Sequence, residues 1–176
     1  VSRGVSNFAD NIALPGMVVN DILQLNIGDA AHNTLRFLVN TTVGLGGVLD
    51  PATPAGAPER PTDFGETLYV WGMGEGAYTE LPLLGPSTAR DALGQVVDFA
   101  LDPFQVLVPE DKKWIGTFAK VYSKVDQRGR YSETVDSILY DSADGYAQAR
   151  LLYLQNRRYE LGQTEAESDF EDPYAQ

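Results

Sequence analysis

The stretch FLVNTTVGLGGVLD, residues 37–50, is mostly apolar, yet three of its last seven residues are glycines, Gly44, Gly46 and Gly47. A helix that crosses a bilayer needs about 20 apolar residues, so this stretch is too short to do so. Its glycines predict that the backbone bends where a helix ends. Periodicity alone also allows a glycine-rich turn buried in a soluble core. From this stretch alone, the apolar surface of the chain could face either its own core or lipid.

Composition limits the answer. The 176 residues are 43% hydrophobic, which allows one domain with a sizeable core. A net charge of −12 and a pI near 4.3 argue against nucleic acid as a partner, because phosphate backbones are bound by clustered Lys and Arg. The absence of cysteine excludes disulfides and thiolate metal sites, and we expect no metal and no cofactor. The chain begins at Val1 without a start methionine or signal peptide, which indicates processing or trimming.

Glycine and proline divide the chain into short helical segments. Helices are predicted at about 6–13, from Pro15 to about 27, from Asp29 into the opening stretch, and at 88–101, 110–130 and 144–161. Between them, residues 51–62 read as a loop, and residues 64–83 as a short hairpin with strands at 68–71 and 78–81. The fold class is thus all-α with one hairpin, a single domain over 1–161 and an acidic, disordered tail over 162–176.

Three motifs invite a catalytic or ligand-binding interpretation. GMGEGA, residues 72–77, fits the dinucleotide fingerprint, but the prolines that follow forbid the helix this site requires, so a plain turn is favoured. His32 is the only histidine, and without a G-x-S-x-G elbow it reads as a surface or rim residue. Arg90 and Asp91 begin a helix and are best explained by its stability, with contact between Arg90 and a lipid phosphate as the alternative. No catalytic residue is predicted.

Helical periodicity reveals more apolar surface than one core needs. The 88–101 helix has an apolar arc of about 200°, with Val96 near its centre, predicted buried, and Val97 and Phe99 at its flanks. The last helix has two apolar sides, and Leu151 and Leu154 on the surplus side are candidates for a partner interface. Phe37 falls opposite the apolar stripe of its own helix. These surplus faces indicate a protein that lies in a membrane without crossing it.

Five segments in the same order cover nearly the whole chain: GVSNFADNI (4–12), NDILQ (20–24), RFLVNTTVGLGGVLD (36–50), DFGETLYVWGMGEGAYTELPLLGPSTARDALG (63–94) and YLQNRRYEL (153–161). With them the chain resembles the MlaA (VacJ) family of bacterial outer-membrane lipoproteins. The resemblance implies a ring-like helical protein in the inner leaflet of the outer membrane, with an amphipathic channel that removes misplaced phospholipid. It also implies a trimeric porin and a periplasmic lipid carrier as partners, and no enzymatic activity.

The resemblance also suggests roles for individual residues. The 64–83 hairpin would line and gate the channel, with Phe64 and Leu83 as pivots and Gly72, Gly74 and Gly76 giving mobility. Phe37, Gly44, Gly46 and Gly47 would form a bend within one leaflet or beside the channel. The family's lipidated N-terminal cysteine is not in this sequence, and Gly145 stands where the family usually has proline.

Transport is predicted to be passive, because no P-loop or other energy-coupling motif is present. The alternative is a soluble periplasmic lipid-binding or scaffold protein whose apolar faces pack on a partner. An enzyme acting on phospholipid ranks third, with His32 as its single candidate base.

Overall fold

The chain folds into helices with one short antiparallel strand pair, as the computed structural model shows for residues 2–81, 85–102, 108–130 and 145–163. This architecture confirms the predicted all-α class with one hairpin. In chain order the elements are α1 (Ser2–Leu23), α2 (Ile27–Thr42), α3 (Phe64–Val70), β1 (Tyr78–Leu81), β2 (Gly85–Thr88), α4 (Ala89–Leu101), the 3₁₀ turn η1 (Glu110–Lys112), α6 (Lys113–Arg130) and α8 (Gly145–Glu160).

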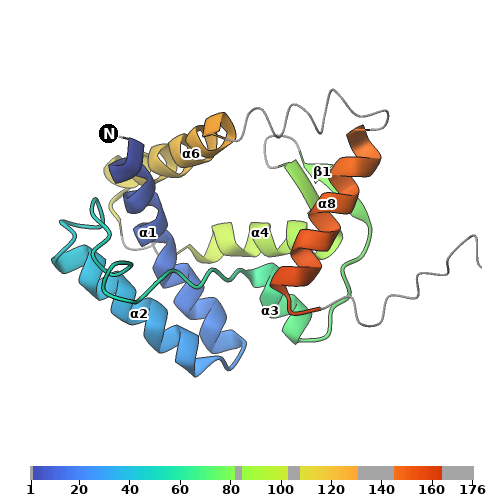
Figure 1. The fold of residues 1–176 in the computed structure, drawn as a ribbon, viewed down its shortest axis with the longest axis horizontal. Coiled ribbons are helices and arrows are strands. Elements are labelled where there is room, and N and C mark those ends of the chain that lie inside the picture. The colour runs from blue at the N-terminus through green and yellow to red at the C-terminus, as the bar shows by residue number, and fades with distance from the viewer. Residues whose placement is uncertain (1, 82–84, 103–107, 131–144, 164–176) are drawn as a thin grey trace, which may run out of the picture.

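The helices are arranged as a ring (Figure 1). α1, α6, α4, α3 and α8 surround a central region, and α2 lies against α1 on the outside. The hairpin packs against α4 on one side and α8 on the other. The ring is therefore built from elements that are distant in sequence.

α1 runs through Pro15 without a break, whereas the sequence predicted two helices divided there. Proline inside a helix removes one backbone hydrogen bond and crowds the preceding turn. α1 packs against both α2 and α6, and this packing outweighs the local preference of one residue. The predicted helix boundary near Pro15 is wrong for that reason.

α2 begins earlier than predicted. Asn26 is its N-cap, and its side-chain oxygen accepts a 3.3 Å hydrogen bond from the N–H of Asp29. Asp29 is therefore not the cap but a carboxylate in the first turn. The positive end of the helix stabilises its negative charge, and it pairs with Arg60.

Residues 64–70 form α3 rather than the first strand of a hairpin. Asp63 caps this helix, because its carboxylate accepts a 2.8 Å hydrogen bond from the N–H of Glu66. The helix ends before Gly72, whose φ of 92° suits a helix C-terminus and whose N–H donates to the Tyr69 carbonyl. The predicted strand at 68–71 is therefore wrong.

The hairpin lies further along the chain. β1 pairs with β2 in a register that sets Tyr78 opposite Thr88 and Leu81 opposite Gly85. Gly85 has a φ of 83°, which glycine adopts without steric cost. Pro86 is tolerated because both strands of a two-stranded sheet are edge strands. The predicted second strand at 78–81 is thus the first strand of the hairpin.

Burial is inverted relative to a water-soluble domain. Among the described residues, seven buried side chains are apolar, five of them alanine, and thirteen are polar or charged. α2 buries Asn33, Arg36 and Asn40, while Leu35 and Leu38 on its apolar stripe are 56% and 53% exposed. Ordinary amphipathic helices place these faces the other way round.

α6 shows the same inversion. The apolar stripe that helical spacing groups on this helix is largely exposed, with Trp114 at 64%, Phe118 at 60% and Val125 at 65%. Ala119 and Ser123 form its buried side. Helical periodicity grouped the stripe correctly, but the stripe does not face the core of the described fold.

Two further expectations concern the ends of the chain and the membrane. Residues 164–176, which make up nearly all of the predicted tail, lie outside the described residues. In the part of the chain that the structure describes, no helix combines the length and the apolar character needed to cross a membrane.

Candidate functional site

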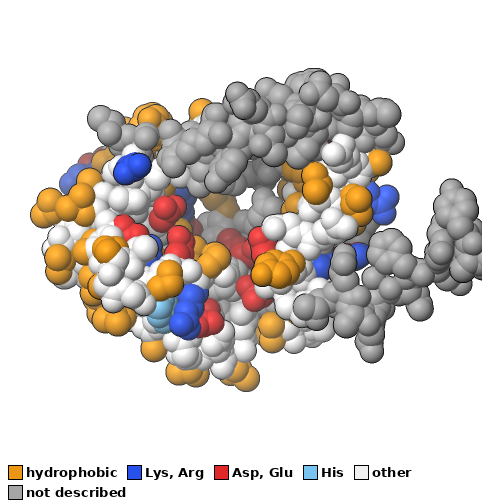
Figure 2. Space-filling model, viewed as in Figure 1, with side chains coloured by type: hydrophobic (Ala, Val, Ile, Leu, Met, Phe, Trp, Pro, Cys, Tyr) orange, Lys and Arg blue, Asp and Glu red, His pale blue; other side chains and the backbone are white. Residues whose placement is uncertain are grey.

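The ring encloses an opening with an acidic rim. Figure 2 shows carboxylate side chains gathered along the left and lower rim of this opening, while apolar side chains lie mainly along the outer edge over α1 and α2. In this view the carboxylates lie nearer the opening than most apolar side chains of α1 and α2, while further apolar side chains lie beside the opening over α8. This distribution suits a surround of lipid or protein better than one of water.

An apolar groove of about 650 Å³ lies between β1, α4 and α6. Its wall includes Val96 and Phe99, which are 65% and 73% exposed, so the predicted burial of Val96 is wrong. α4 instead turns Gly94 inward, so close to α3 that a Cβ there would lie 2.4 Å from the Gly65 nitrogen. The polar groups of the groove are Gln95, Asp98, Asp102 and Lys120.

A second apolar groove, of about 780 Å³, lies between the start of α1, the end of the opening stretch and α6. Its apolar wall comprises Val5, Phe8, Val48, Leu49, Ile115 and Phe118. The volume of each groove is sufficient for a small ligand or part of an acyl chain, since ligand pockets commonly measure about 300–1,000 Å³.

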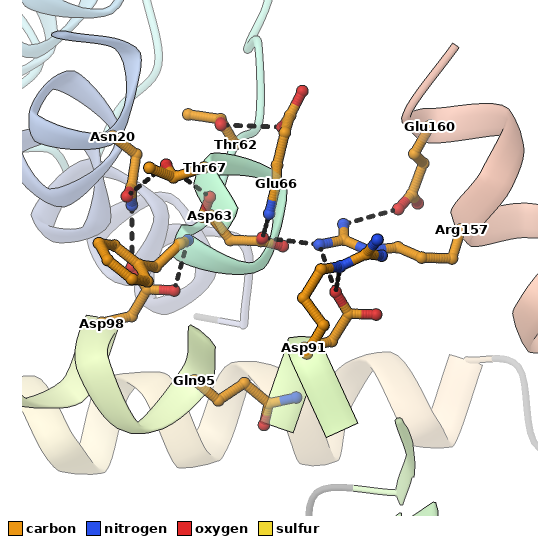
Figure 3. A network of polar contacts seen from close by, with 12 residues as sticks. Asn20, Thr62, Asp63, Glu66, Thr67, Asp91, Gln95, Asp98, Arg157 and Glu160 are labelled. Carbon is orange, nitrogen blue, oxygen red and sulfur yellow. Dashed lines mark hydrogen bonds and ion pairs between the residues drawn. The ribbon is translucent and has the colours of Figure 1, made fainter. Parts of the chain in front are cut away.

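A polar network attaches α8 to the rest of the ring (Figure 3). Arg157 Nη2 lies 2.6 Å from Asp63 Oδ1 and 3.2 Å from Asp91 Oδ1. Arg157 Nη1 lies 3.2 Å from Glu160 Oε2, and the Tyr153 hydroxyl donates to Asp91 Oδ2 at 2.8 Å. One guanidinium therefore joins the last described helix to the cap of α3 and to the first turn of α4.

A second part of the network joins α1, α3 and α4 around Asp98. Asn20 Nδ2 donates to Asp98 Oδ1 at 2.8 Å, and the N–H of Phe64 donates to Oδ2 at 3.0 Å. The Thr67 hydroxyl, fully buried, donates to the side-chain oxygen Oδ1 of Asn20 at 3.0 Å. Because buried polar groups are costly without partners, these bonds fix how the three helices meet.

The two central carboxylates differ in their electrostatics. Burial raises the pKa of Asp98, and the bonds from Phe64 and Asn20 offset this only in part. Burial acts on Asp91 too, but hydrogen bonds from Thr88 and Tyr153 and the charge of Arg157 outweigh it and lower its pKa. Asp91 is thus a stable anion at neutral pH and the natural counter-charge of Arg157.

The residues predicted to form a gated hairpin are placed differently from the prediction. Phe64 begins α3, and its ring packs edge-on against Trp71 with centroids 5.7 Å apart. Gly72 and Gly76 have φ of 92° and 71°, and a Cβ at Gly74 would meet nothing within 4 Å. The three glycines therefore link α3 to β1 and do not form the hairpin turn. The predicted pivot Leu83 lies outside the described residues. Gating by this segment remains a prediction.

The predicted bend is present in the opening stretch. Gly44 is buried so closely that a Cβ would lie 2.3 Å from the Asn40 carbonyl oxygen and 2.4 Å from that of Leu49. Gly47 has a φ of 93°, and a Cβ there would lie 2.5 Å from Asn11 Nδ2 of α1. Only glycine fits these two positions, so the bend is held tightly against α1.

The remaining residues of the predicted bend are at its surface. Phe37 is half-buried on α2, and Gly46 is exposed with a φ of 74°. The N–H groups of Gly46 and Gly47 donate to the carbonyls of Thr41 and Asn40 at 2.9 and 2.8 Å. These two donors are thus satisfied within the segment, as backbone groups at lipid depth have to be. Contact with a membrane or channel stays a prediction.

The two candidate interface leucines lie on α8. Leu151 is 55% exposed, and Leu154 is partly buried. Ala149 is buried and Tyr153 bonds to Asp91, so the opposite side of this helix packs on the ring. A partner on the leucine side remains a prediction.

Sequence reasoning missed Asp63, Asp98 and Arg157 as organising residues. The D-x-x-E spacing of Asp63 and Glu66 is a helix-start signal that would have found the first. Arg157 and Asp98 carry no such signal, because their partners lie far away in the chain.

His32 is half-buried and bonds through Nε2 to the Pro58 carbonyl at 2.7 Å, which agrees with a rim residue. Within the described ranges, no group of three or more His, Cys, Asp or Glu could hold a metal ion.

Comparisons with known proteins agree with the architecture. An uncharacterised protein of Rickettsia felis is 34% identical over 151 residues, which are 85% of this chain and 59% of that protein. The intermembrane phospholipid transport system lipoprotein MlaA of Shigella flexneri is 32% identical over 161 residues, which are 89% of this chain and 62% of that protein. The chain thus spans about three-fifths of the length of the curated relatives it matches.

A solved structure from work on the structural basis for maintenance of bacterial outer membrane lipid asymmetry superposes with a TM-score of 0.72 at 31% identity. The superposition covers 91% of this chain and 79% of the other. The sequence pattern described as MlaA lipoprotein matches residues 1–160. With sequence and fold in agreement over nearly all of its length, this chain belongs to the MlaA lipoprotein family.

Proposed function

We propose that the chain takes part in phospholipid transport at the inner leaflet of the bacterial outer membrane. It removes misplaced outer-leaflet phospholipid passively through the central opening and passes it to a periplasmic lipid carrier, while a trimeric porin binds its outer surface. No chemical step is involved. Membership of the family supports the substrate class, since relatives from Shigella flexneri and Escherichia coli are named as lipoproteins of an intermembrane phospholipid transport system.

The observation that carries the proposal is the inverted burial of α2 and α6. Both helices turn polar or small side chains inward, and both leave an apolar stripe exposed, with Leu38 at 53% and Trp114 at 64%. Apolar surface on this scale usually marks contact with lipid or another protein. The exposed apolar stripes suit acyl chains around the ring, and the carboxylates along the rim of the opening suit a polar path beside the apolar groove.

The groove along α4 supplies both chemistries that a phospholipid needs. Val96 and Phe99 offer an apolar wall for an acyl chain. Lys120 Nζ and Asp102 Oδ2, 2.5 Å apart in the same groove, offer charges of both signs to a headgroup. An amphipathic lining of this kind lowers the cost of moving a lipid that has a polar end and an apolar end.

The experiment is a flotation and transfer assay on the full chain. Liposomes and purified protein are centrifuged through a density gradient with and without porin, and removal of a labelled phospholipid from the outer leaflet is followed. Flotation without porin together with lipid removal supports the proposal. Protein that stays at the bottom unless porin is present would favour a soluble lipid-binding or scaffold protein instead.

Gating by the 64–83 segment and its continuation into β2 can be tested by a cross-link. Tyr78 of β1 packs edge-on against Tyr146 of α8, with ring centroids 5.5 Å apart. Cysteines at these two positions, in a chain that has none of its own, can be joined by a short bismaleimide. Cross-linking should block lipid removal and leave porin binding intact. Undiminished removal would show that this segment does not need to move.

A further inference from the structure

A polar pocket of about 370 Å³ lies apart from both apolar grooves and shares no lining residue with them. It is formed by the end of α3, the glycine-rich turn after it, the start of α4 and the end of α8. Its lining residues are Tyr69, Gly72, Met73, Gly74, Glu75, Arg90, Arg158 and Gln163. The turn is the GMGEGA segment, which leads into β1, so the helix needed for a dinucleotide site does not begin there.

Arg90 is the buried charge of this pocket. The residue is 2% exposed, and its guanidinium carbon lies 5.5 Å from the centre of the Tyr69 ring. Nε donates to Asp91 Oδ1 at 3.2 Å, but Nη1 and Nη2 have no hydrogen-bond partner among the described residues. Neither nitrogen belongs to the fully buried unpaired atoms of the described residues, and Arg90 lines the pocket, so both nitrogens are reached from it. They are therefore available to a ligand that accepts hydrogen bonds.

Asp91 cannot neutralise Arg90 alone, because its carboxylate is shared. Oδ1 also accepts from Arg157 at 3.2 Å, and Oδ2 accepts from Tyr153 and Thr88, each at 2.8 Å. The Asp91 carboxylate therefore compensates the positive charge of Arg90 only in part.

The rim of the pocket adds further donors. Arg158 bonds to Glu75 through Nε at 3.2 Å and Nη2 at 2.7 Å, which leaves Nη1 for another acceptor. The backbone N–H groups of Gly74 and Glu75 donate to no group within the described part of the chain. The pocket thus brings two guanidiniums to one small volume, with Glu75 beside Arg158 and Asp91 behind Arg90 as their carboxylate partners.

We propose that this pocket binds a phosphate group, held by Arg90 from within and by Arg158 and the N–H groups of the 74–75 turn at its rim. A tetrahedral phosphate presents acceptor oxygens in several directions, which matches two forked guanidiniums and a turn better than a planar carboxylate does. The phosphate belongs either to a lipid headgroup or to free phosphate. Because the pocket is separate from the grooves, the site stands even if the transport proposal fails.

The test is isothermal titration calorimetry on the full chain at low salt. The probes are inorganic phosphate, dihexanoyl phosphatidic acid below its critical micelle concentration, and dihexanoyl glycerol, which lacks the phosphate. Two variants address the site without touching the buried charge. Arg158→Gln removes the rim cation, and Gly74→Asp adds a carboxylate where a Cβ meets nothing within 4 Å. The matched control is Arg60→Gln, which removes a guanidinium from the surface pair with Asp29.

Binding of phosphate or phosphatidic acid should weaken by about tenfold or more in both site variants and stay unchanged in the control, as expected for loss of one charge-assisted hydrogen bond. Binding of phosphatidic acid alone assigns the site to a lipid headgroup, and binding of inorganic phosphate as well assigns it to free phosphate. Equal affinity in all four proteins, binding of dihexanoyl glycerol as tight as that of phosphatidic acid, or no binding by the unaltered chain would overturn the proposal.

Discussion

Arg157 and Asp63 are separated by 94 positions in the chain, yet Nη2 of the first lies 2.6 Å from Oδ1 of the second. The same guanidinium also reaches Asp91. α8 is therefore fixed to the ring largely by a charge shared between two carboxylates, and less by apolar packing, since Leu151 and Leu152 on this helix are 55% and 42% exposed.

Arg157→Gln should lower the free energy of unfolding by about 3 kcal/mol, because it leaves the buried Asp91 carboxylate without its main counter-charge. Arg158→Gln is the matched control. It breaks a pair whose side chains are 45% and 35% exposed, and should cost less than about 1 kcal/mol. Chemical denaturation of both variants measures the difference, and equal losses would mean that the network does not hold α8.

Val96→Asp and Phe99→Asp should leave the protein folded and weaken its association with liposomes, because both side chains line an exposed groove. Leu14→Asp, at a position only 1% exposed, should unfold the protein, since an unpaired buried charge costs several kcal/mol. Thermal unfolding and liposome flotation of the three variants decide the matter. If the groove variants unfold as Leu14→Asp does, α4 has a conventional core face.

Leu151→Glu combined with Leu154→Glu should reduce co-purification with porin by tenfold or more, as anchors in an interface often contribute about 2 kcal/mol or more. Gln155→Glu adds a charge at an exposed position of the same helix and serves as the control. Circular dichroism checks that the fold survives. Loss of structure in the double variant would place these leucines in the core.

Gly47→Ala should destabilise the protein more than Gly46→Ala. Both positions have a left-handed φ, of 93° and 74°, which costs a residue with a Cβ about 1–2 kcal/mol. Only Gly47 faces a neighbour, since its Cβ would lie 2.5 Å from Asn11 Nδ2. The additional variant Asn11→Gly, which also removes the Asn11 Cβ that would lie 2.6 Å away, should recover part of the loss at Gly47 and none at Gly46. Urea midpoints test this, and equal losses would show that the bend moves away from α1 easily.

Glu59→Gln should stabilise the protein at pH 7 and have little effect near pH 4. Burial, and next the charge of Asp10, raise the pKa of Glu59 above its ordinary value of 4.5. A raised pKa in the folded state means that folding favours the protonated carboxyl, so its charge destabilises the fold as pH rises past 4.5. Denaturation midpoints at the two pH values check the sign. The exposed Glu110→Gln is the control, and a loss of stability at pH 7 in Glu59→Gln would contradict the prediction.

The sequence indicated which side chains share a helix face, but not which face turns inward. On α2 the stripe containing Leu35 and Leu38 was correctly grouped, and Asn33 and Arg36 lie on the opposite side. The usual rule that the apolar face is buried holds only when water surrounds the fold. Where another medium surrounds it, periodicity alone leaves the direction open.

Local signals predicted helix existence better than helix limits. Pro15 failed as a boundary because packing of α1 on two helices outweighs one proline. The turn glycines at 72–76 were read as a hairpin because the cap formed by Asp63 and Glu66 was overlooked. The Arg157 contacts could not be predicted from any local pattern, since they depend on how distant segments meet in space.

The position of Arg157 near the end of the described chain has a consequence for the order of folding. During synthesis, the segments that carry Asp63 and Asp91 leave the ribosome well before α8 exists. Until residue 157 follows, neither carboxylate has this cation, and the ring cannot close around its opening. Contacts over such long stretches of chain form late and slowly. Attachment of α8 through Arg157 therefore has to follow synthesis of residue 157, and chains truncated before it lack the cation that joins Asp63 to Asp91.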